Sequence, residues 1–454
     1  MEAPTAHYHA CGLHLWRFMH RSSGAWQAVP PPSSEPLLLC DTGFEIVRPM
    51  SSPRPTPPPP TTPPLLASTR RTVLEAASLG VAAVRIPALL RCRDGRLVVF
   101  AEARHEGAGD TGQIDVIAAV SLDGGRSFGA PVVVARGEGG TRGNPVPIEA
   151  ADGDIVLLTT SNAASATERD ILAGAVPPAQ SRRVHLTRLS PELEVREDRE
   201  ITAEAKREDW GWYATGPGHG IRLPSGRLVV PANHSVLGGA GDSGPADGRP
   251  ADGDPRDGDR SPYGAHGLLS DDDGRTWRIS WVTGGIAGAS GPNESALCPD
   301  PADPSEALVT MRNEHRDDAC TRLLARTRDG GEALEAPQVL TGFAGPRLQT
   351  GLGALPGGPA LLSAPLREEA RRDLALHAVT GPGPSGAEPS GAACRPVGLL
   401  LEEPAGYSDL AVGPEAVHVL VETGDERPHE RLDLITIDLP TALRAVGDPK
   451  EQHP

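Results

Sequence analysis

The chain has 454 residues and a formal net charge of −17, with 38% hydrophobic and 23% charged residues. This length accommodates one large domain or two ordinary ones. The negative charge argues against a general nucleic-acid-binding protein, although a local basic patch could still hold a small anionic ligand. No run of about 18 apolar residues occurs, so the sequence predicts no membrane-spanning helix and no membrane partner.

Residues 1–66 do not read as part of a folded domain. Residues 1–50 show no helix or strand period, and residues 53–64 are nearly all Pro and Thr, which is typical of a disordered or polyproline linker. The basic-then-apolar pattern of a secretory signal is missing, so we expect a cytoplasmic protein, with secretion by another route left open. Met50 is as good a candidate for the translation start as Met1.

The cysteines predict no metal site. None of the six has CxxC or other metal-ligand spacing, and they stand at Cys11, Cys40, Cys92, Cys298, Cys320 and Cys394. We expect free thiols, with a disulfide between Cys298 and Cys320 left open.

Residues 84–110 contain the most informative hairpin. Two apolar runs at residues 86–90 and 97–101 are joined by an Arg-Asp-Gly-Arg turn signal. Glu102 and Arg104 extend the second run, and because they are two positions apart they lie on one face of the strand. Asp110 follows in a glycine-rich loop. These charges form either a solvated strand face or a site, and the remaining sequence favours a site.

Strands that end in Ser or Thr recur along the chain. Each is followed by a turn and a second apolar strand, and the five end at Ser121, Ser190, Ser270, Thr327 and Thr380. When a polar insertion at residues 236–262, which we expect to be flexible, is set aside, the repeat is about 55 to 65 residues long. A period of that size, with about four strands per unit, predicts an all-β, six-bladed β-propeller over residues 67–440 and a tail at residues 441–454.

Two of the turns match the Asp-box pattern S-x-D-x-G-x-[ST]-[WF]. Residues 270–277 fit at every position, and residues 121–128 fit again; the turn after Thr327 keeps half of the pattern. In such a turn the Asp side chain caps backbone amides, Gly takes a positive φ and the aromatic packs beneath. We therefore predict that these turns are structural.

Two Asp boxes together with Arg85-Ile86-Pro87 make the chain resemble the sialidases, six-bladed propeller exo-glycosidases. The resemblance covers roughly residues 72–438 and implies three arginines that bind the substrate carboxylate, because planar guanidinium groups suit a carboxylate. The first is Arg85, and Arg312 in an Arg-Asn pair resembles the second. The R-x-[ND]-L pattern selects Arg371 as the third, with Arg372 as the alternative.

The same resemblance implies three catalytic residues. Tyr407, in a Tyr-Ser-Asp-Leu segment, resembles the family's nucleophile, and a neutral phenol avoids repulsion from the substrate carboxylate. Glu294, in an Asn-Glu-Ser segment, is the base that takes the phenolic proton. Asp110 is the acid/base, which protonates the leaving oxygen and then activates water.

Further positions resemble the family in supporting roles. Arg104 is implied to hold ring substituents of the sugar, and Glu422 to orient Arg85. The aromatic segment at residues 210–221 either walls the pocket or packs within a blade, and Asn144-Pro145 resembles a structural step of the family.

Together these features predict an exo-α-sialidase that releases terminal α-linked sialic acid from glycans with retention, as a monomer without metal or other cofactor. One alternative is a relative that acts on another nonulosonic acid or releases an anhydro product. A second alternative is a propeller that only binds glycans, which has no reason to keep Tyr407, Glu294 and Asp110 together.

Overall fold

The computed structural model describes residues 62–237, 263–284, 291–314, 322–368, 370–381 and 391–447, and the backbone of four short strands near the N-terminus. The chain divides into two units, Met1–Pro60 and Thr61–Pro454. The first unit contains two antiparallel hairpins, formed by β1 (His9–Ala10) with β2 (Leu13–His14) and by β3 (Met19–Ser22) with β4 (Ala25–Ala28). The remainder of its predicted linker lies outside the described residues.

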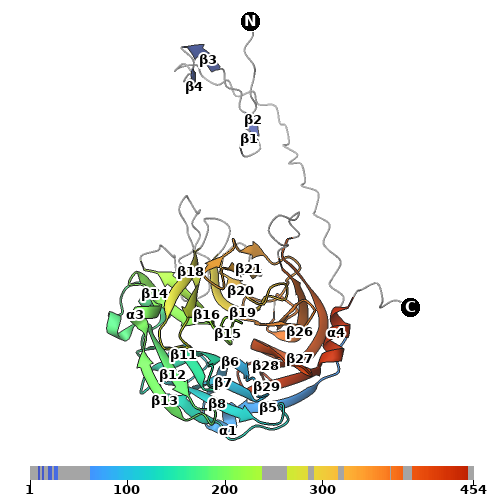
Figure 1. Cartoon of the computed structure of the whole chain (residues 1–454). Helices are drawn as coiled ribbons and strands as arrows, with labels where there is room; N and C mark the ends of the chain where they lie inside the picture. The colour runs from blue at the N-terminus through green and yellow to red at the C-terminus, as the bar shows by residue number, and fades with distance from the viewer. Residues whose placement is uncertain are drawn as a thin grey trace, which may run out of the picture. The chain divides into compact units, whose positions relative to one another are not determined.

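The second unit consists of antiparallel sheets arranged around a common centre (Figure 1). Antiparallel pairing groups its first half into three meanders, of which the first two are joined by one parallel contact between Thr141 and Ile114. They are β6 (Ala83–Arg91), β7 (Leu97–Arg104), β8 (Ile114–Ser121) and β9 (Val132–Ala135); β10 (Thr141–Glu149), β11 (Ile155–Asn162), β12 (Arg183–Leu189) and β13 (Val195–Glu200); and β14 (Trp210–Thr215), β15 (Ile221–Arg222), β16 (Leu228–Val236), β17 (Tyr263–Ser270) and β18 (Arg278–Gly284).

Three more meanders follow. The fourth contains β19 (Pro292–Pro299), β20 (Ala307–Asn313), β21 (Arg322–Arg328), β22 (Ala333–Leu334) and β23 (Gln338–Val339). The long strand β27 (Ala393–Val412) belongs to the last two, because its first part pairs with β26 and its second part with β28. Their other strands are β24 (Gly351–Ala354), β25 (Ala360–Pro365), β26 (Arg372–Thr380), β28 (Ala416–Thr423), β29 (Arg431–Asp438) and β5 (Thr69–Glu75). This arrangement confirms the predicted β-propeller.

The last meander is closed by the first strand of the domain. β5 pairs antiparallel with β29, from Arg431 opposite Glu75 to Thr436 opposite Thr69. Apolar side chains from both ends of the domain then pack together, for example Leu74 with Leu432 in one buried cluster. β29 is thereby paired on both sides and β5 forms the outer edge of this meander, so the two ends of the domain are joined in one sheet.

Helices are few and short. They are α1 (Ala76–Leu79), α2 (Glu168–Leu172), the 3-10 turn η1 (Pro178–Gln180), α3 (Thr202–Ala205) and α4 (Leu439–Val446). Within the described residues, no helix is long and apolar enough to cross a membrane. Cys92, Cys298 and Cys394 are buried free thiols, whereas Cys320 lies outside the described residues.

The predicted domain boundaries are too narrow at both ends. Leu65 bridges Leu399, and Leu66 packs against the cluster formed by the last two meanders. At the other end α4 places Ala442 in the same cluster, so the expected tail at residues 441–454 begins inside a packed helix. An eight-residue helix and a short apolar pair carry too little periodicity to reveal such packing.

Both complete Asp boxes form the predicted turns. Asp272 accepts hydrogen bonds from the Thr276 amide at 2.8 Å and the Thr276 hydroxyl at 2.6 Å, and Ser270 Oγ accepts from the Gly274 amide at 2.8 Å. Gly274 has a φ of 86°, and Trp277 is buried. The turn after Ser121 repeats this pattern, with Asp123 accepting from Ser127.

Replacing the Asp of this turn should therefore weaken the fold. We expect Asp272→Ala to lower the free energy of unfolding by about 1–3 kcal/mol, because the Thr276 amide and the hydroxyl of Ser270 lose their acceptor. Urea denaturation measures the change. Asp271→Ala is the matched control, because the exposed Asp271 forms only surface ion pairs with Arg227 and Arg278, and its loss should cost at most about 1 kcal/mol. Equal losses in the two variants would contradict the structural role.

Candidate active site

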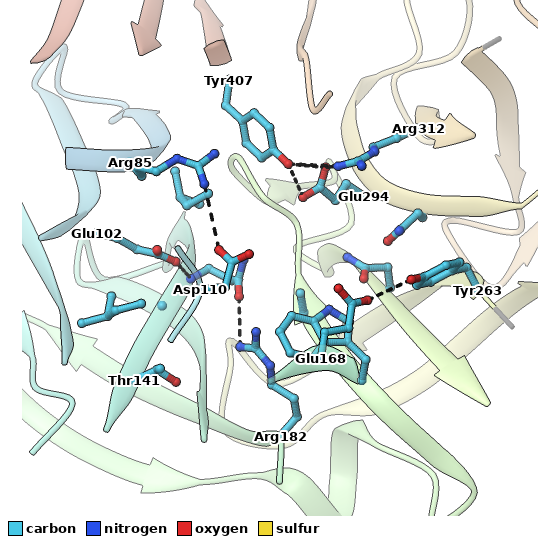
Figure 2. A pocket seen from close by; sticks show the side chains of 18 of the residues that line it. Arg85, Glu102, Asp110, Thr141, Glu168, Arg182, Tyr263, Glu294, Arg312 and Tyr407 are labelled. Carbon is cyan, nitrogen blue, oxygen red and sulfur yellow. Dashed lines mark hydrogen bonds and ion pairs between the residues drawn. The ribbon is translucent and has the colours of Figure 1, made fainter. Parts of the chain in front are cut away.

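The predicted site residues lie around one pocket of about 200 Å³ (Figure 2). Its walls are strongly polar, and most come from the ends of strands in different meanders. The lining residues are Arg85, Ile86, Glu102, Arg104, Asp110, Ile114, Thr141, Gly143, Asn144, Glu168, Arg182, Trp212, Ala214, Asn233, Tyr263, Asn293, Glu294, Arg312, Glu314 and Tyr407. Of the predicted site residues, Arg371 and Glu422 are not part of this lining.

Glu422 contacts Arg85, the residue that it was predicted to orient, and it also joins two strands. Its carboxylate accepts from the Arg85 Nε at 3.2 Å and from the backbone amides of Ile86 at 2.8 Å and Tyr407 at 3.0 Å. Ile86 has a positive φ of 57°, an unusual backbone for a β-branched residue that this bond helps to hold. A side chain at Gly406 would meet the same carboxylate at 2.3 Å, which explains the glycine there.

Removing the charge of Glu422 should make the fold less stable in a pH-dependent way. Burial opposes its ionisation, but Arg85 and His429 lower its pKa from 4.5 to about 2. A group with a depressed pKa contributes stability above pH 4.5 and loses it as the pH falls towards 2. We expect Glu422→Gln to cost about 3 kcal/mol at pH 7, with a smaller loss near pH 3.

Urea denaturation at both pH values tests this expectation. Glu403→Gln is the control, because this carboxylate is 42% exposed and pairs with Arg70 and Arg431 at the surface. If Glu422→Gln lowered the free energy of unfolding equally at pH 7 and pH 3, the ionised carboxylate of Glu422 would not be the stabilising group.

Tyr407, Glu294 and Arg312 form a compact hydrogen-bonded group (Figure 2). The Tyr407 hydroxyl donates to Glu294 at 2.7 Å, and Arg312 Nη1 donates to the Tyr407 oxygen at 3.0 Å and to Glu294 at 2.8 Å. Burial and the Glu294 charge raise the pKa of Tyr407, although Arg312 and Arg85 oppose this effect. Ionisation of the phenol therefore requires a proton acceptor in contact, and Glu294 is placed to be one.

The other candidate arginines occupy different positions. Arg312 also forms an ion pair with Glu314, which Arg347 contacts at 3.2 Å. The guanidinium carbon of Arg371 lies 5.8 Å from the centre of the Tyr407 ring, compared with 5.1 Å for Arg85. Arg371 therefore lies near the pocket but on an exposed segment.

The alternative third arginine points elsewhere. Arg372 donates to the backbone carbonyl of Glu402 at 2.8 Å and contacts Asp373 at 3.3 Å. Between the two adjacent arginines, the geometry favours Arg371.

The Asp110 carboxylate forms ion pairs with Arg104 and Arg85 through one of its oxygens. Its Oδ1 lies 2.8 Å from Arg104 Nη2 and 4.0 Å from Arg85 Nη1, and its side chain is 60% exposed. Desolvation opposes ionisation of Asp110, but Arg104, Arg85 and Arg182 outweigh it and lower the pKa. Asp110 is thus a carboxylate at neutral pH when no substrate is bound.

Glu102 and Arg104 share one strand face, as predicted, but that face is buried. Arg104 Nε donates to Glu102 at 2.8 Å, and each side chain is at most 3% exposed. Glu102 also accepts from the Asn144 amide at 2.7 Å, so the predicted structural step at Asn144 anchors this pair. Arg104 therefore holds Glu102 and Asp110, and its guanidinium faces the pocket only in part.

Several lining residues were not predicted. Arg182 lies over the Trp212 ring, with its guanidinium carbon 3.5 Å from the ring centre. Tyr263 donates to Glu168 at 3.1 Å, and burial raises the pKa of Glu168. Figure 2 shows Arg182, Glu168 and Tyr263 across the pocket from Tyr407. Glu168 begins a helix capped by Thr167, so in the sequence it resembles an ordinary helix start.

The aromatic segment at residues 210–221 has both of the roles considered for it, as a wall of the pocket and as packing within a blade. Trp212 lines the pocket, whereas Trp210 stacks on His234 with ring centres 3.8 Å apart and Tyr213 bonds His266 at 3.2 Å. The segment therefore both walls the site and fills the third meander.

Within the described residues, no three His, Cys, Asp or Glu side chains gather as a metal site. The pocket instead offers guanidinium groups for an anion, a tyrosine in contact with a carboxylate, and a second carboxylate across from them. Such an arrangement can bind an acidic sugar and carry out nucleophilic and acid–base chemistry on it.

The BNR repeat-like domain model matches residues 95–419, more than half of the chain. The protein therefore belongs to the family with a BNR repeat-like domain. An exo-alpha-sialidase of Aspergillus fumigatus is 31% identical over 192 residues, which cover 37% of this chain and 46% of the relative. Human sialidase-4 is 37% identical over 83 residues, 18% of this chain and 15% of the relative. The chain thus matches less than half the length of these curated relatives.

Solved structures share the fold at low identity. The Hadza microbial sialidase Hz136 matches 84% of this chain and 69% of its own with a TM-score of 0.63 and 19% identity. The intramolecular trans-sialidase from Ruminococcus gnavus matches 83% of this chain and 98% of its own with a TM-score of 0.63 and 15% identity. These matches support the fold and leave the chemistry to be argued from this chain's own residues.

Proposed function

We propose that this protein is an exo-α-sialidase that hydrolyses terminal α-linked sialic acid with retention of configuration. The contact between the Tyr407 hydroxyl and Glu294, 2.7 Å long and set among arginines, carries the proposal. A buried tyrosine bonded to a carboxylate and an arginine is an activated nucleophile rather than a packing residue. The sialidase relatives make sialylated glycans the natural substrate class.

The arginines bind and orient the substrate. The carboxylate of sialic acid docks between Arg85 and Arg312, with Arg371 completing the set from the rim. Glu422 keeps Arg85 in place through its Nε, which leaves the terminal nitrogens for the substrate. The arginines already provide a positive electrostatic field in the free pocket. The substrate carboxylate binds in this field and neutralises these cations.

The first half-reaction forms a covalent intermediate. Tyr407 Oη attacks the anomeric carbon and passes its proton to Glu294, while the bond to the aglycone oxygen breaks and Asp110 donates a proton to that oxygen. In the second half, Asp110 takes a proton from water, the water oxygen attacks the anomeric carbon, and the departing Tyr407 recovers its proton from Glu294. Two inversions at one carbon give overall retention.

Release of 4-methylumbelliferone from its α-sialoside by the full chain tests the activity, and ¹H NMR of the first-formed sugar tests the stereochemistry. We expect fluorophore release with α-sialic acid appearing first. An anhydro sugar as the product, or turnover only with a different nonulosonic acid, would redirect the proposal to the related activities considered above. A folded chain that binds sialic acid without any release would make the protein a glycan-binding propeller.

A further inference from the structure

Arg182 is a buried cation that the proposed reaction does not yet use. It is 4% exposed, and the partners that the structure gives it are neutral: Asn144 Oδ1 at 3.4 Å, Thr160 Oγ1 at 3.0 Å and the face of Trp212. Its Nε is buried without a hydrogen-bond partner. No carboxylate of the described residues lies within ion-pair distance of it.

A buried charge with no carboxylate in contact is unfavourable, and the carboxylates whose charges stabilise Arg182 from a distance are Asp110, Glu102 and Glu168. A neutral side chain of similar size could fill the space beside Trp212 without that cost. Burial lowers the pKa of Arg182 to about 10, which still leaves the guanidinium charged at neutral pH. The charge is therefore retained at a position where packing alone does not require it.

Arg182 shares the pocket with Asp110, and its charge helps to lower the pKa of that carboxyl group. Both line the same pocket, and Figure 2 shows the Arg182 guanidinium directed towards Asp110 from the side opposite Arg85. The ion-pair contacts of Asp110, to Arg104 and Arg85, both involve its Oδ1.

We propose that Arg182 is a positioning residue that holds the Asp110 carboxylate over the leaving oxygen of the substrate and sets when it gains its proton. Arg104 anchors one oxygen directly, whereas Arg182 acts from across the pocket without a direct bond. Stacking on Trp212 and the hydrogen bonds to Asn144 and Thr160 hold the Arg182 guanidinium in its place in the pocket. The role of Asp110 in this inference rests on the proposed function. The electrostatic coupling between Arg182 and Asp110 does not depend on that function.

The coupling is testable without any activity. In ¹³C-aspartate-labelled full chain, the carboxyl signal of Asp110 is assigned by its loss in Asp110→Asn and followed by NMR as a function of pH. We expect Arg182→Gln to raise the titration midpoint of Asp110 by at least about half a pH unit, because a nearby cation that favoured the carboxylate is gone. Arg182→Lys, which keeps the charge, should restore most of the shift.

Arg142→Gln is the matched control. Arg142 is 6% exposed on the neighbouring strand β10 and bonds Thr159 and Asp198, but it does not line the pocket. Its loss should leave the Asp110 midpoint unchanged. An unchanged midpoint in Arg182→Gln would overturn the proposal, and so would equal shifts in both variants, since that would indicate a general structural effect.

Kinetics separate positioning from sugar binding. In the pH profile of kcat, the basic limb of Arg182→Gln should move upward with the NMR midpoint. If KM alone rose while the profile stayed fixed, Arg182 would be a contact of the sugar and the proposal would be wrong. Failure of the wild type to release the fluorophore would contradict the proposed function but would leave the NMR result as the test of the coupling.

Discussion

Tyr407→Phe is expected to lower kcat on the 4-methylumbelliferyl α-sialoside by at least about 10³-fold. The substitution removes the attacking oxygen and nothing else from the pocket wall. Arg85 still stacks beside the ring, and the 2.8 Å contact between Arg312 and Glu294 does not involve the tyrosine. Affinity for sialic acid should therefore change only a few-fold, so the loss appears in kcat and not in KM.

Initial rates and calorimetric titration with sialic acid measure the two quantities separately. Tyr213→Phe is the matched control, because Tyr213 is another buried tyrosine with one hydroxyl bond, to His266, and it lies outside the pocket lining. We expect it to keep nearly full activity. A Tyr407→Phe enzyme within tenfold of wild type would exclude Tyr407 as the nucleophile, whatever its binding constant.

Asp110→Asn is expected to have an effect that depends on the leaving group. The hydroxyl oxygen of a sugar is a poor leaving group unless it is protonated, so the rate of sialyllactose hydrolysis should fall by about 10²–10⁴-fold. The 4-methylumbelliferyl group leaves easily, and the first half-reaction with this substrate should lose much less. Glu106→Gln, an exposed carboxylate in the same loop that does not line the pocket, should leave both rates unchanged.

The pH dependence should separate the free enzyme from the complex. Arginines lower the pKa of Asp110 in the empty site. A bound substrate carboxylate cancels part of that positive charge, so the pKa of Asp110 rises in the complex and the protonated acid persists to higher pH. The basic limb of kcat should therefore lie at higher pH than that of kcat/KM. Coinciding limbs, or equal losses of Asp110→Asn on both substrates, would rule out this acid.

The sequence revealed parts of the site whose signals are local. The hairpin around Arg85, the Asp-box turns and the segments around Glu294 and Tyr407 each depend on a few consecutive residues, and the structure places Arg85, Glu294 and Tyr407 in the lining of one pocket. Nothing in the segments themselves required that proximity. It follows from the ring of sheets, which brings the inner strand ends of separate meanders together.

Residues whose roles depend on distant partners could not be predicted. Arg182 precedes β12 in a polar stretch, and only the fold stacks it on Trp212. Glu314 directly follows the Arg-Asn pair, yet its role as a counter-ion to Arg312 and Arg347 requires three separate segments to meet. Glu102 and Arg104 show the opposite case: alternation predicted their shared face, but not that the face is buried.

The pairing of β5 with β29 also determines when the domain can become complete during synthesis. β5 is translated first, but its partner is translated almost last, so the ring stays open until the ribosome has made nearly the entire domain. Until then the edges of β5 and β28 are exposed to other chains, and such edges promote aggregation. A chain that stops before Arg431 would lack β29 and with it the pairing that joins β5 to β28.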